Sequence, residues 1–288
     1  MVTMCKVFNV STSGYYAWLK SEGKAPSESE LKRDELKKHI RYFFHRSHGT
    51  YGAKRIQKDL LSIGIKVSDR TVGRYLKTLG LRATPESTYI VTTDSEHSNG
   101  VFDNHLDQIF EVSEPNKVWV SDITYIWTSQ GWLYLAVVLD LFARKVVGWD
   151  MMDHMRTELP LSALEQAIIE RRPPPDLLHH SDRGTQYASN LYKDRLLSIQ
   201  AIGSMSRTGN PYDNACAESF FATLKKEFTH RRKFKTKAEA IQAINWYIGV
   251  FYNERRRHSS NNYLSPNQAE RGEFEVCPSN LESYLLAS

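Results

Sequence analysis

Three β-rich runs in the middle of the chain constrain its fold more than any other feature. Residues 117–128 alternate apolar and polar side chains, and residues 131–142 and 144–151 follow after very short breaks. Strands joined by such short connections are antiparallel, because a parallel connection needs a dozen or more residues. The sequence therefore predicts a three-stranded antiparallel meander over residues 117–151.

Helical and strand patterns alternate after this meander. The predicted helices span residues 159–172, 189–198, 213–230 and 237–252, and the predicted short strands span residues 177–181 and 201–206. A run of three prolines at 173–175 ends the first of these helices. Three strands followed by alternating helices and strands predict an α/β fold with a mixed sheet.

The first third of the chain has a helical pattern. Helices are predicted over residues 27–46, 53–63 and 69–79, and Gly64 and Gly80 follow the last two as C-caps. Two short helices joined by a tight turn are typical of a helix-turn-helix DNA-binding unit, although a small bundle with a solvated basic face has the same pattern. The candidate DNA-binding side chains are Lys54, Arg55, Arg70, Arg74 and Lys77.

These changes of pattern divide the chain into five parts. They are an N-terminal arm (1–26), a helix-turn-helix domain (27–83), a linker (84–115), an α/β domain (116–272) and a C-terminal tail (273–288). The linker is rich in Ser, Thr, Asn and Asp, with one short strand predicted at residues 89–92.

The composition narrows the class of protein. The 288 residues are 41% hydrophobic, which is enough for a real core, and the net charge of +5 is compatible with a polyanionic partner. The three cysteines are far apart, so neither a disulfide framework nor a zinc knuckle is expected. The most apolar run, residues 133–142, is too short to span a bilayer, so a cytoplasmic protein is expected.

Three carboxylates are the candidate chemical site. Asp122 lies within the strand at 117–128, where a charge is costly unless it is paired or metal-bound, although an isolated Asp at a sheet edge facing water would need neither. Asp182 lies just past the strand at 177–181, and Glu218 lies early in the helix at 213–230. If the three converge, their mutual repulsion calls for a divalent cation, and ligation by oxygen alone suits Mg²⁺ or Mn²⁺.

The spacing of these residues resembles a known signature. Asp182 and Glu218 are separated by 35 residues (218 − 182 = 36), as in the DD(35)E signature of retroviral-integrase-like transposases, and Lys225 matches that family's basic residue. Ordered blocks along essentially the whole chain resemble the second-frame product of transposases of the insertion-sequence-three family. These blocks are "GTYGAKRI", "WVSDITYI", "LDLFARKVVGW", "HSDRGTQYAS", "NPYDNACAESFFATLKKE" and "YNERRRHSSNNYLSP".

The resemblance implies a fold and a reaction. The fold is an RNase H-like core, a five-stranded mixed sheet with helices on both sides. The reaction is cleavage at the 3′ end of an element by water, followed by attack of the freed 3′-OH on another phosphodiester, with two Mg²⁺ ions in one site and Mn²⁺ as a substitute. Asp122 would bridge both ions, Asp182 would bind one directly, and Glu218 would complete one ion's shell.

Further residues are expected to contact DNA or to support the site. Arg183 and Gln186 follow Asp182 in a loop and are candidates for the DNA end, and Lys225 is a candidate for a phosphate contact. Arg255, Arg256 and Arg257 form a basic cluster for which phosphate contact and a solvated charge run are both open.

The remaining polar residues around the site have structural interpretations. Asp140 is a rival carboxylate interpreted as structural, Glu227 points away from Glu218, and Asp213 is an N-cap candidate. His179 and His180 are expected to fill the end of their strand, because Mg²⁺ prefers oxygen ligands.

Three hypotheses follow from the sequence. The first is a transposase that acts on the terminal inverted repeats of an insertion sequence and on target DNA, associated with the bacterial nucleoid. It is expected to act as a dimer or higher oligomer on DNA, with or without an upstream-frame protein that supplies another helix-turn-helix and a coiled coil. The second is an RNase H-like nuclease without strand transfer. The third is a DNA-binding regulator with an inert α/β part.

Overall fold

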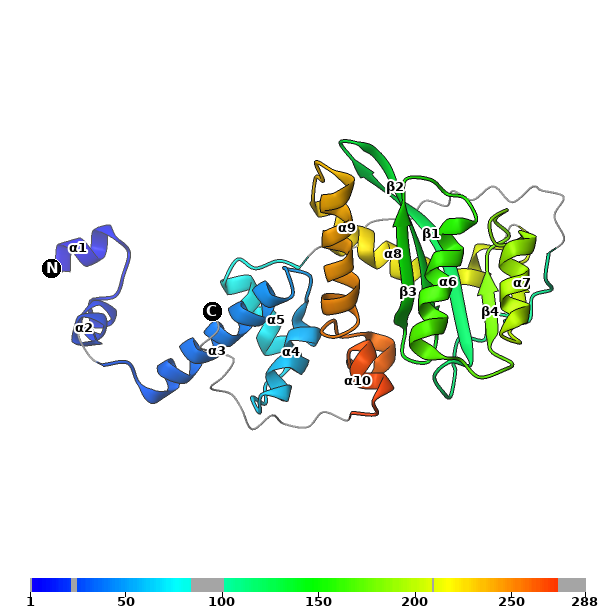
Figure 1. The fold of residues 1–288 in the computed structure, drawn as a ribbon. Coiled ribbons are helices and arrows are strands. Elements are labelled where there is room, and N and C mark those ends of the chain that lie inside the picture. The colour runs from blue at the N-terminus through cyan, green and yellow to red at the C-terminus, as the bar shows by residue number, and fades with distance from the viewer. Residues whose placement is uncertain (1, 22–24, 84–100, 209, 274–288) are drawn as a thin grey trace.

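The chain folds into a helical N-terminal part and an α/β part that packs against it (Figure 1). The computed structural model describes residues 2–21, 25–83, 101–208 and 210–273. The N-terminal helices are α1 (Val2–Val7), α2 (Thr12–Ser21), α3 (Glu28–Arg46), α4 (Ala53–Ser62) and α5 (Asp69–Thr78). The strands are β1 (Val118–Thr128), β2 (Gly131–Asp140), β3 (Lys145–Met152), β4 (Leu178–Ser181) and β5 (Ile202–Met205). The later helices are α6 (Glu158–Arg171), α7 (Asn190–Ser198), α8 (Ala215–Glu227), α9 (Lys237–Trp246) and α10 (Pro266–Glu270).

The five strands form one mixed sheet in the order β3-β2-β1-β4-β5. β1, β2 and β3 are antiparallel neighbours, which confirms the predicted meander. β4 lies parallel to both β1 and β5, as the helical connections through α6 and α7 require. The predicted five-stranded mixed sheet with flanking helices is therefore confirmed.

Helices cover both faces of this sheet, and the two faces have separate cores. Val120 and Ile126 of β1 pack in one core with Phe220 and Leu224 of α8. Trp119 of β1 lies in the other core, which includes buried residues of α6 and α7. The alternation of side chains along β1 thus separates the α8–α9 side of the sheet from the α6–α7 side.

A glycine lets α6 approach the sheet closely. Gly148 lies in β3, and a Cβ at this position would stand 2.2 Å from the carbonyl oxygen of Ala163 and 2.8 Å from the Cβ of Ala167. Both partners belong to α6 and are buried. Only a residue without a side chain fits between the strand and the helix at this point.

The N-terminal part is a small bundle of α3, α4 and α5 with its own apolar core. Ile40, Ile56, Leu60, Val72 and Leu76 are buried within it. Its helix starts follow the expected chemistry: Ser27 forms a capping box with Glu30, and the Ser68 side chain accepts a hydrogen bond from Thr71 N–H. The turn between α4 and α5 gives the predicted helix-turn-helix arrangement.

Several predicted boundaries need correction. The helix predicted over 213–230 is divided into a 3₁₀ turn (Pro211–Asn214), α8 and a second 3₁₀ turn (Thr229–Arg231). The helix predicted over 237–252 is α9 followed by a π-helical turn (Tyr247–Tyr252). The segment predicted as an arm contains the two helices α1 and α2. The strand predicted at 89–92 and nearly all of the tail predicted at 273–288 lie outside the described residues.

The interpretation of Asp213 as an N-cap is wrong. Its buried carboxylate accepts hydrogen bonds from the Arg207 guanidinium and from the side chains of Asn104 and Gln108. These bonds, the Arg207 one foremost, hold the pKa of Asp213 well below its usual range. Asp213 therefore ties the segment before β1 to the entrance of α8. Along the described ranges, no helix is sufficiently long and apolar to cross a bilayer.

Candidate functional site

The pairing of β1 with β4 brings the two aspartates together. The parallel register joins Val120 to His180 and Ser121 to Ser181. One residue further along, the same register puts Asp122 beside Asp182, where β4 ends and β1 continues. Residues 60 positions apart along the chain therefore become neighbours at the carboxyl end of β4, the edge of a parallel sheet where ligands commonly bind.

Helix α8 supplies the third carboxylate. The amide of Asn214, immediately before α8, donates to the carbonyl oxygen of Ser121 at 3.1 Å. At the other end of the helix, Lys225 Nζ lies 4.8 Å from the centre of the Tyr125 ring. The helix thus runs alongside β1 from Ser121 to Tyr125, and Glu218 lies between these two contacts.

The electrostatics of Asp122 report the proximity of all three carboxylates. Burial, the Asp182 carboxylate and the Glu218 carboxylate raise the pKa of Asp122 well above its ordinary value, against the lowering effects of the Ile123 N–H and Lys225. The Ile123 N–H donates to Asp122 Oδ1 at 2.8 Å, and the Gly184 N–H donates to Asp182 Oδ1 at 2.9 Å. Asp122, Asp182 and Glu218 are all half-buried, so the site is open on one side.

The chemistry of these donors fits a hard divalent cation. All three are carboxylates, and each raises the free energy of ionising its neighbours, a cost that a bound cation removes. Within the residues described, no three His, Cys, Asp or Glu side chains already stand in a metal-binding arrangement. The three carboxylates are therefore neighbours under mutual repulsion rather than a formed set of ligands.

Buried histidines support the floor of the site, as predicted from the strand end. His179 Nε2 lies 2.9 Å from Ser121 Oγ and 3.1 Å from the Tyr192 hydroxyl. His180 is hydrogen-bonded through both ring nitrogens, Nδ1 to Ser204 Oγ at 2.9 Å and Nε2 to Ser206 Oγ at 3.1 Å. Burial lowers the pKa of His179 to about 3 and that of His180 to about 4, so both rings are neutral at pH 7.

Tyr187 is a residue of this site that the sequence reasoning missed. Its side chain is buried, its hydroxyl has no hydrogen-bond partner, and burial, Tyr192, Asp122 and Asp182 all raise its pKa. A tyrosine five residues past a strand-end aspartate carries no distinctive signal in a sequence. Only the tertiary fold places its hydroxyl beside the two aspartates.

Four of the predicted DNA-binding cations are exposed on the helical bundle. Arg70, Arg74 and Lys77 lie at positions i, i+4 and i+7 of α5 and share one face of that helix. Lys54, at the start of α4, is exposed as well. The second helix of the helix-turn-helix thus presents a basic face to solvent.

Three other predicted DNA contacts need correction, because their guanidinium groups face carboxylates inside the protein. Arg256 is buried and makes two bonds of 2.7 Å to Glu227, and Arg55 lies 3.5 Å from the same carboxylate. Arg257 is buried and donates to Asp59 at 2.6 Å. The Arg55–Glu227 and Arg257–Asp59 pairs join the bundle to the α/β part, whereas the Arg256–Glu227 pair lies within the α/β part. The basic cluster at 255–257 leaves only Arg255 exposed.

The charge of Glu227 is stabilised by these partners. Burial raises its pKa, but the charge and hydrogen bonds of Arg256, the charge of Arg55 and the hydrogen bond from the Tyr247 hydroxyl outweigh that effect and leave the pKa lowered. The backbone N–H of Arg257 also donates to the Tyr51 hydroxyl at 2.7 Å. The helical bundle is therefore docked on the α/β part by buried ion pairs and a hydrogen bond.

The two candidate DNA-binding residues of the loop after β4, Arg183 and Gln186, form hydrogen bonds within the protein. Arg183 donates to the carbonyl oxygen of Ser206 and to the hydroxyl of Thr208. The Gln186 amide donates to the carbonyl oxygen of Met155 at 2.8 Å. Both side chains brace the loop that carries Asp182, and both remain partly accessible.

The rival carboxylate Asp140 has a local structural role. It accepts the backbone N–H groups of Asn116 and Phe142, and it lies 3.7 Å from Arg171. Burial raises its pKa despite these contacts. Its oxygens secure the end of β2.

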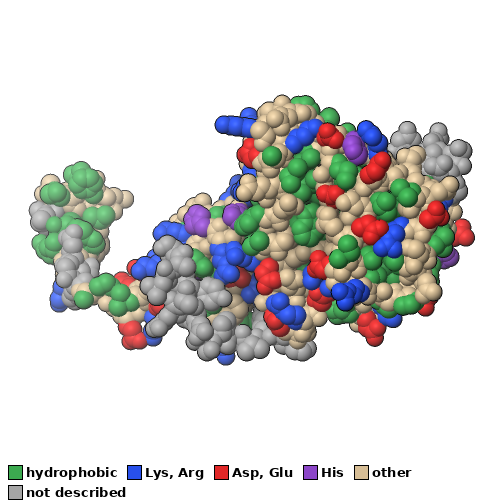
Figure 2. Space-filling model, in the orientation of Figure 1, with side chains coloured by type: hydrophobic (Ala, Val, Ile, Leu, Met, Phe, Trp, Pro, Cys, Tyr) green, Lys and Arg blue, Asp and Glu red, His purple; other side chains and the backbone are tan. Residues whose placement is uncertain are grey.

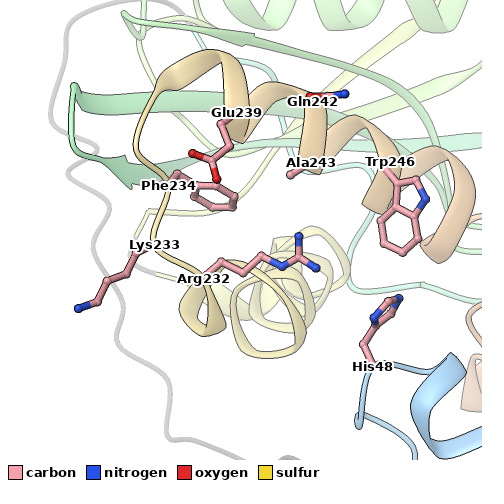
Figure 3. Close-up of a pocket in the computed structure, with 8 residues that line it drawn as sticks. All are labelled: His48, Arg232, Lys233, Phe234, Glu239, Gln242, Ala243 and Trp246. Atoms are coloured by element: carbon pink, nitrogen blue, oxygen red, sulfur yellow. The ribbon is translucent and has the colours of Figure 1, made fainter.

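A basic segment at residues 230–237 is a second feature that the sequence reasoning missed. Arg232 and Lys233 of this segment line a cavity of about 610 Å³, together with Trp246 of α9 and His48 of the helical bundle. Figure 3 shows Arg232 reaching between α9 and His48, whereas Lys233 extends away. Figure 2 shows histidine and basic side chains gathered where the bundle meets the α/β part.

Comparison with known proteins identifies the parts of the chain. Two profiles described as "Integrase core domain" match residues 112–211 and 202–266, and an "HTH-like domain" profile matches residues 32–87. These matches cover both the docked helical bundle and the sheet with its three carboxylates.

Close relatives span nearly the whole chain. A 31 kDa protein of insertion element IS600 from Shigella sonnei is 43% identical, covering 91% of this chain and 96% of that protein. The transposase for insertion sequence element IS904 from Lactococcus lactis is 42% identical, covering 85% and 97%. Transposase InsF for insertion sequence IS3A from Escherichia coli is 39% identical, covering 93% and 92%.

Proposed function

The chain belongs to the IS3-type insertion-sequence transposases with an integrase core, and from this premise we propose that it cleaves and joins DNA strands. Its substrates are the terminal inverted repeats of its element and a target duplex. The observation that supports the proposal is the β1–β4 register that ends beside Asp122 and Asp182, together with the raised pKa of Asp122, to which the Asp182 and Glu218 carboxylates both contribute.

The reaction consists of two displacements at phosphorus in one site. In the first, water attacks the phosphodiester at the 3′ end of the element, and the bond to the 3′ oxygen breaks. In the second, the freed 3′-OH attacks a phosphodiester of another strand. A new P–O bond forms, and the bond from that phosphorus to the 3′ oxygen of the attacked strand breaks. A divalent cation pair, Mg²⁺ or Mn²⁺, supplies the positive charge that both displacements need.

The residues of this chain hold and orient the reactants. Asp122, Asp182 and Glu218 would hold the cations, and Glu218 would also help to orient the attacking oxygen. The bonds from Ile123 and Gly184 N–H hold the two aspartates in position beforehand. Lys225, about two helical turns past Glu218, would contact a phosphate of the bound strand.

Recognition of DNA is assigned to the helical bundle. The exposed basic face of α5, with Arg70, Arg74 and Lys77, suits a DNA groove, and Lys54 suits a backbone phosphate. Two ends must be held together for joining, so we propose a dimer or higher oligomer on DNA. An upstream-frame protein that supplies a further helix-turn-helix and a coiled coil is the proposed accessory partner.

One assay separates this proposal from a nuclease and from a DNA-binding regulator. End-labelled element DNA is incubated with Mg²⁺ and either the wild type or the Asp122→Asn variant. The wild type should nick at the 3′ end and join strands, and the variant should do neither while still shifting the DNA in a gel. Asp194→Asn, which removes an exposed carboxylate of α7, is the matched control and should react as the wild type does.

Other outcomes contradict the proposal in distinct ways. Cleavage without joining would favour the nuclease, and DNA binding without cleavage would favour the regulator. Equal activity of Asp122→Asn and wild type would contradict the assigned site itself.

A further inference from the structure

The outer half of the β1–β2 hairpin extends beyond the rest of the sheet. β4 pairs with β1 only up to Ser121, whereas β1 continues to Thr128, paired with β2 and bridged to Phe234 at its last residue. Figure 1 shows this tip projecting beside the start of α9. The hairpin extends past β4 from Asp122 onward and past β3 after Tyr125, because β3 pairs with β2 as far as Tyr134, opposite Tyr125. It therefore leads away from the carboxylates.

Three large aromatic side chains are exposed on this extension. Tyr125, Trp127 and Trp132 are 40%, 60% and 44% exposed. Trp127 lies opposite Trp132 in the strand register, and both Trp127 and Tyr125 contact the Trp132 ring edge to face, with centroids 4.8 and 5.0 Å away. A cross-strand aromatic pair stabilises a hairpin, but it does not require rings to face water to this extent.

Basic groups lie beside one ring of the aromatic cluster of Tyr125, Trp127 and Trp132 and in the segment bonded to the hairpin tip. Lys225 Nζ lies 4.8 Å from the Tyr125 ring centre. The tip of the hairpin is bonded to the basic segment at 230–237, because Ser129 N–H donates to the Phe234 carbonyl oxygen and Lys237 N–H donates to Gln130 Oε1. Exposed cations of that segment are Arg231, Arg232, Lys233 and Lys235. Figure 3 shows the end of the hairpin beside Phe234 and Lys233.

We propose that this aromatic cluster and the adjoining basic segment bind unpaired nucleotides of DNA next to the carboxylates. The bases stack on the rings, and the phosphates contact Lys225 and the cations of the segment, a combination that suits single strands because every base offers a π-face. The inference rests on the proposed function for the identity of the nucleic acid.

The spacing along β1 gives the reach of this surface. Tyr125 and Trp127 lie three and five residues past Asp122, or about 10 and 16 Å along a strand. The rings lie on the opposite face of the sheet from Asp122, because side chains alternate along β1. β4 leaves the edge of β1 unpaired just past Ser121, and Lys225 of α8 lies near the Tyr125 ring there, so a single strand held at the carboxylates can pass this edge and meet the rings within a few nucleotides. Paired bases in a duplex are stacked on one another and offer no free face to the rings, so the surface distinguishes unpaired from paired DNA.

The test compares binding of single-stranded and double-stranded DNA by the full chain. Fluorescence anisotropy is measured in EDTA with a labelled single-stranded oligonucleotide and with the blunt duplex of the same sequence. The Trp127→Ala/Trp132→Ala variant should bind the single strand about tenfold or more weakly than the wild type. Its affinity for the duplex, which the helical bundle holds, should stay within about twofold.

Two further variants keep the outcome interpretable. Trp127→Phe/Trp132→Phe retains aromatic faces and the hairpin pairing, and it should bind the single strand nearly as the wild type does. Trp18→Ala, which removes an exposed tryptophan of α2, should bind both DNAs unchanged. Near-ultraviolet circular dichroism checks that the alanine variant is folded.

Three results would overturn the inference. They are unchanged single-strand binding by the folded alanine variant, an equal loss of affinity for both DNAs, and a changed oligomeric state without loss of binding. Because EDTA prevents cleavage, this test is independent of the proposed reaction. A wild type that binds single strands through these tryptophans but never cuts DNA would contradict the proposed function alone.

Discussion

At the scale of single residues, the charge of Asp122 opposes folding. Its pKa is raised by burial and by two neighbouring carboxylates, so in the native state it holds a proton at pH values where the unfolded chain has lost it. Stability therefore falls as the pH rises through the ordinary pKa of an aspartate toward the raised one. The protein keeps a destabilising group at this position, as functional sites commonly do.

Removing this charge should stabilise the protein. Asp122→Asn is expected to raise the Tm measured at pH 7 in EDTA by a few degrees, since about 1 kcal/mol shifts the Tm of a domain of this size by roughly 2–4 °C. Added Mg²⁺ should raise the Tm of the wild type more than that of the variant. Differential scanning calorimetry checks both. A variant that is less stable than the wild type in EDTA would show that the three carboxylates do not repel one another.

Residue types and spacing were sufficient to find the three carboxylates, but they could not predict which arginines are exposed and which are paired inside the protein. Asp182 and Glu218 stand at a distinctive interval, and Asp122 is a charge in an apolar strand. The run of Arg255, Arg256 and Arg257, in contrast, carries no mark of which guanidinium faces Glu227 or Asp59. Those carboxylates lie 29 and 198 residues away along the chain, so the packing within the α/β part decides the position of Arg256 and the docking of the bundle decides that of Arg257.

At the scale of elements, periodicity predicted the strands and most helices because each buries one face. Periodicity did not predict the 3₁₀ turns at the ends of α8 or the π turn after α9. Asp213 bonds to Arg207 and draws the entrance of α8 into a 3₁₀ turn, and the chain after Trp246 widens into a π turn that keeps Tyr247, Phe251 and Tyr252 buried. These local changes of helix type follow from tertiary contacts and leave the apolar pattern of the sequence intact.

The contact between β3 and α6 gives a prediction at this scale. Gly148→Ala places a methyl group 2.2 Å from a main-chain oxygen of α6, so the helix must move away from the sheet. Such overpacking should lower the free energy of unfolding by about 1–3 kcal/mol, measured by urea denaturation. Gly249→Ala, where nothing lies within 4 Å, should not destabilise the protein. Equal stabilities for the two variants would contradict the close packing of α6 on β3.

At the scale of the whole molecule, buried ion pairs hold the helical bundle on the α/β part. Glu227→Gln removes the carboxylate that faces Arg256 within the α/β part and Arg55 of the bundle, and it leaves the buried Arg256 without its partner. The expected loss is about 3–5 kcal/mol in urea denaturation, with earlier proteolysis between the two parts. Glu165→Gln breaks the more exposed Arg195 pair and should cost less than about 1 kcal/mol. Comparable losses for the two variants would contradict the role assigned to Glu227.

Acid should weaken the same docking. The pKa of Glu227 is lowered in the folded state, so its contribution to stability is present above the ordinary glutamate pKa of about 4.5 and is lost as the pH falls through the lowered value. Small-angle scattering between pH 7 and pH 3 should show the two parts separating at the acid end. In Glu227→Gln, which keeps the Arg257–Asp59 pair, the two parts should separate at a higher pH than in the wild type.

The Glu227 ion pairs also bear on the layout of the DNA. If the α5 face that binds a DNA sequence and the carboxylates of the cleavage site belong to one rigid body, the distance between them fixes the number of base pairs between the recognition sequence and the scissile bond. Five extra base pairs would turn the scissile bond to the opposite side of the double helix, whereas ten or eleven would restore its facing. Cleavage should therefore tolerate base substitutions between the recognition sequence and the scissile bond far better than insertions or deletions there.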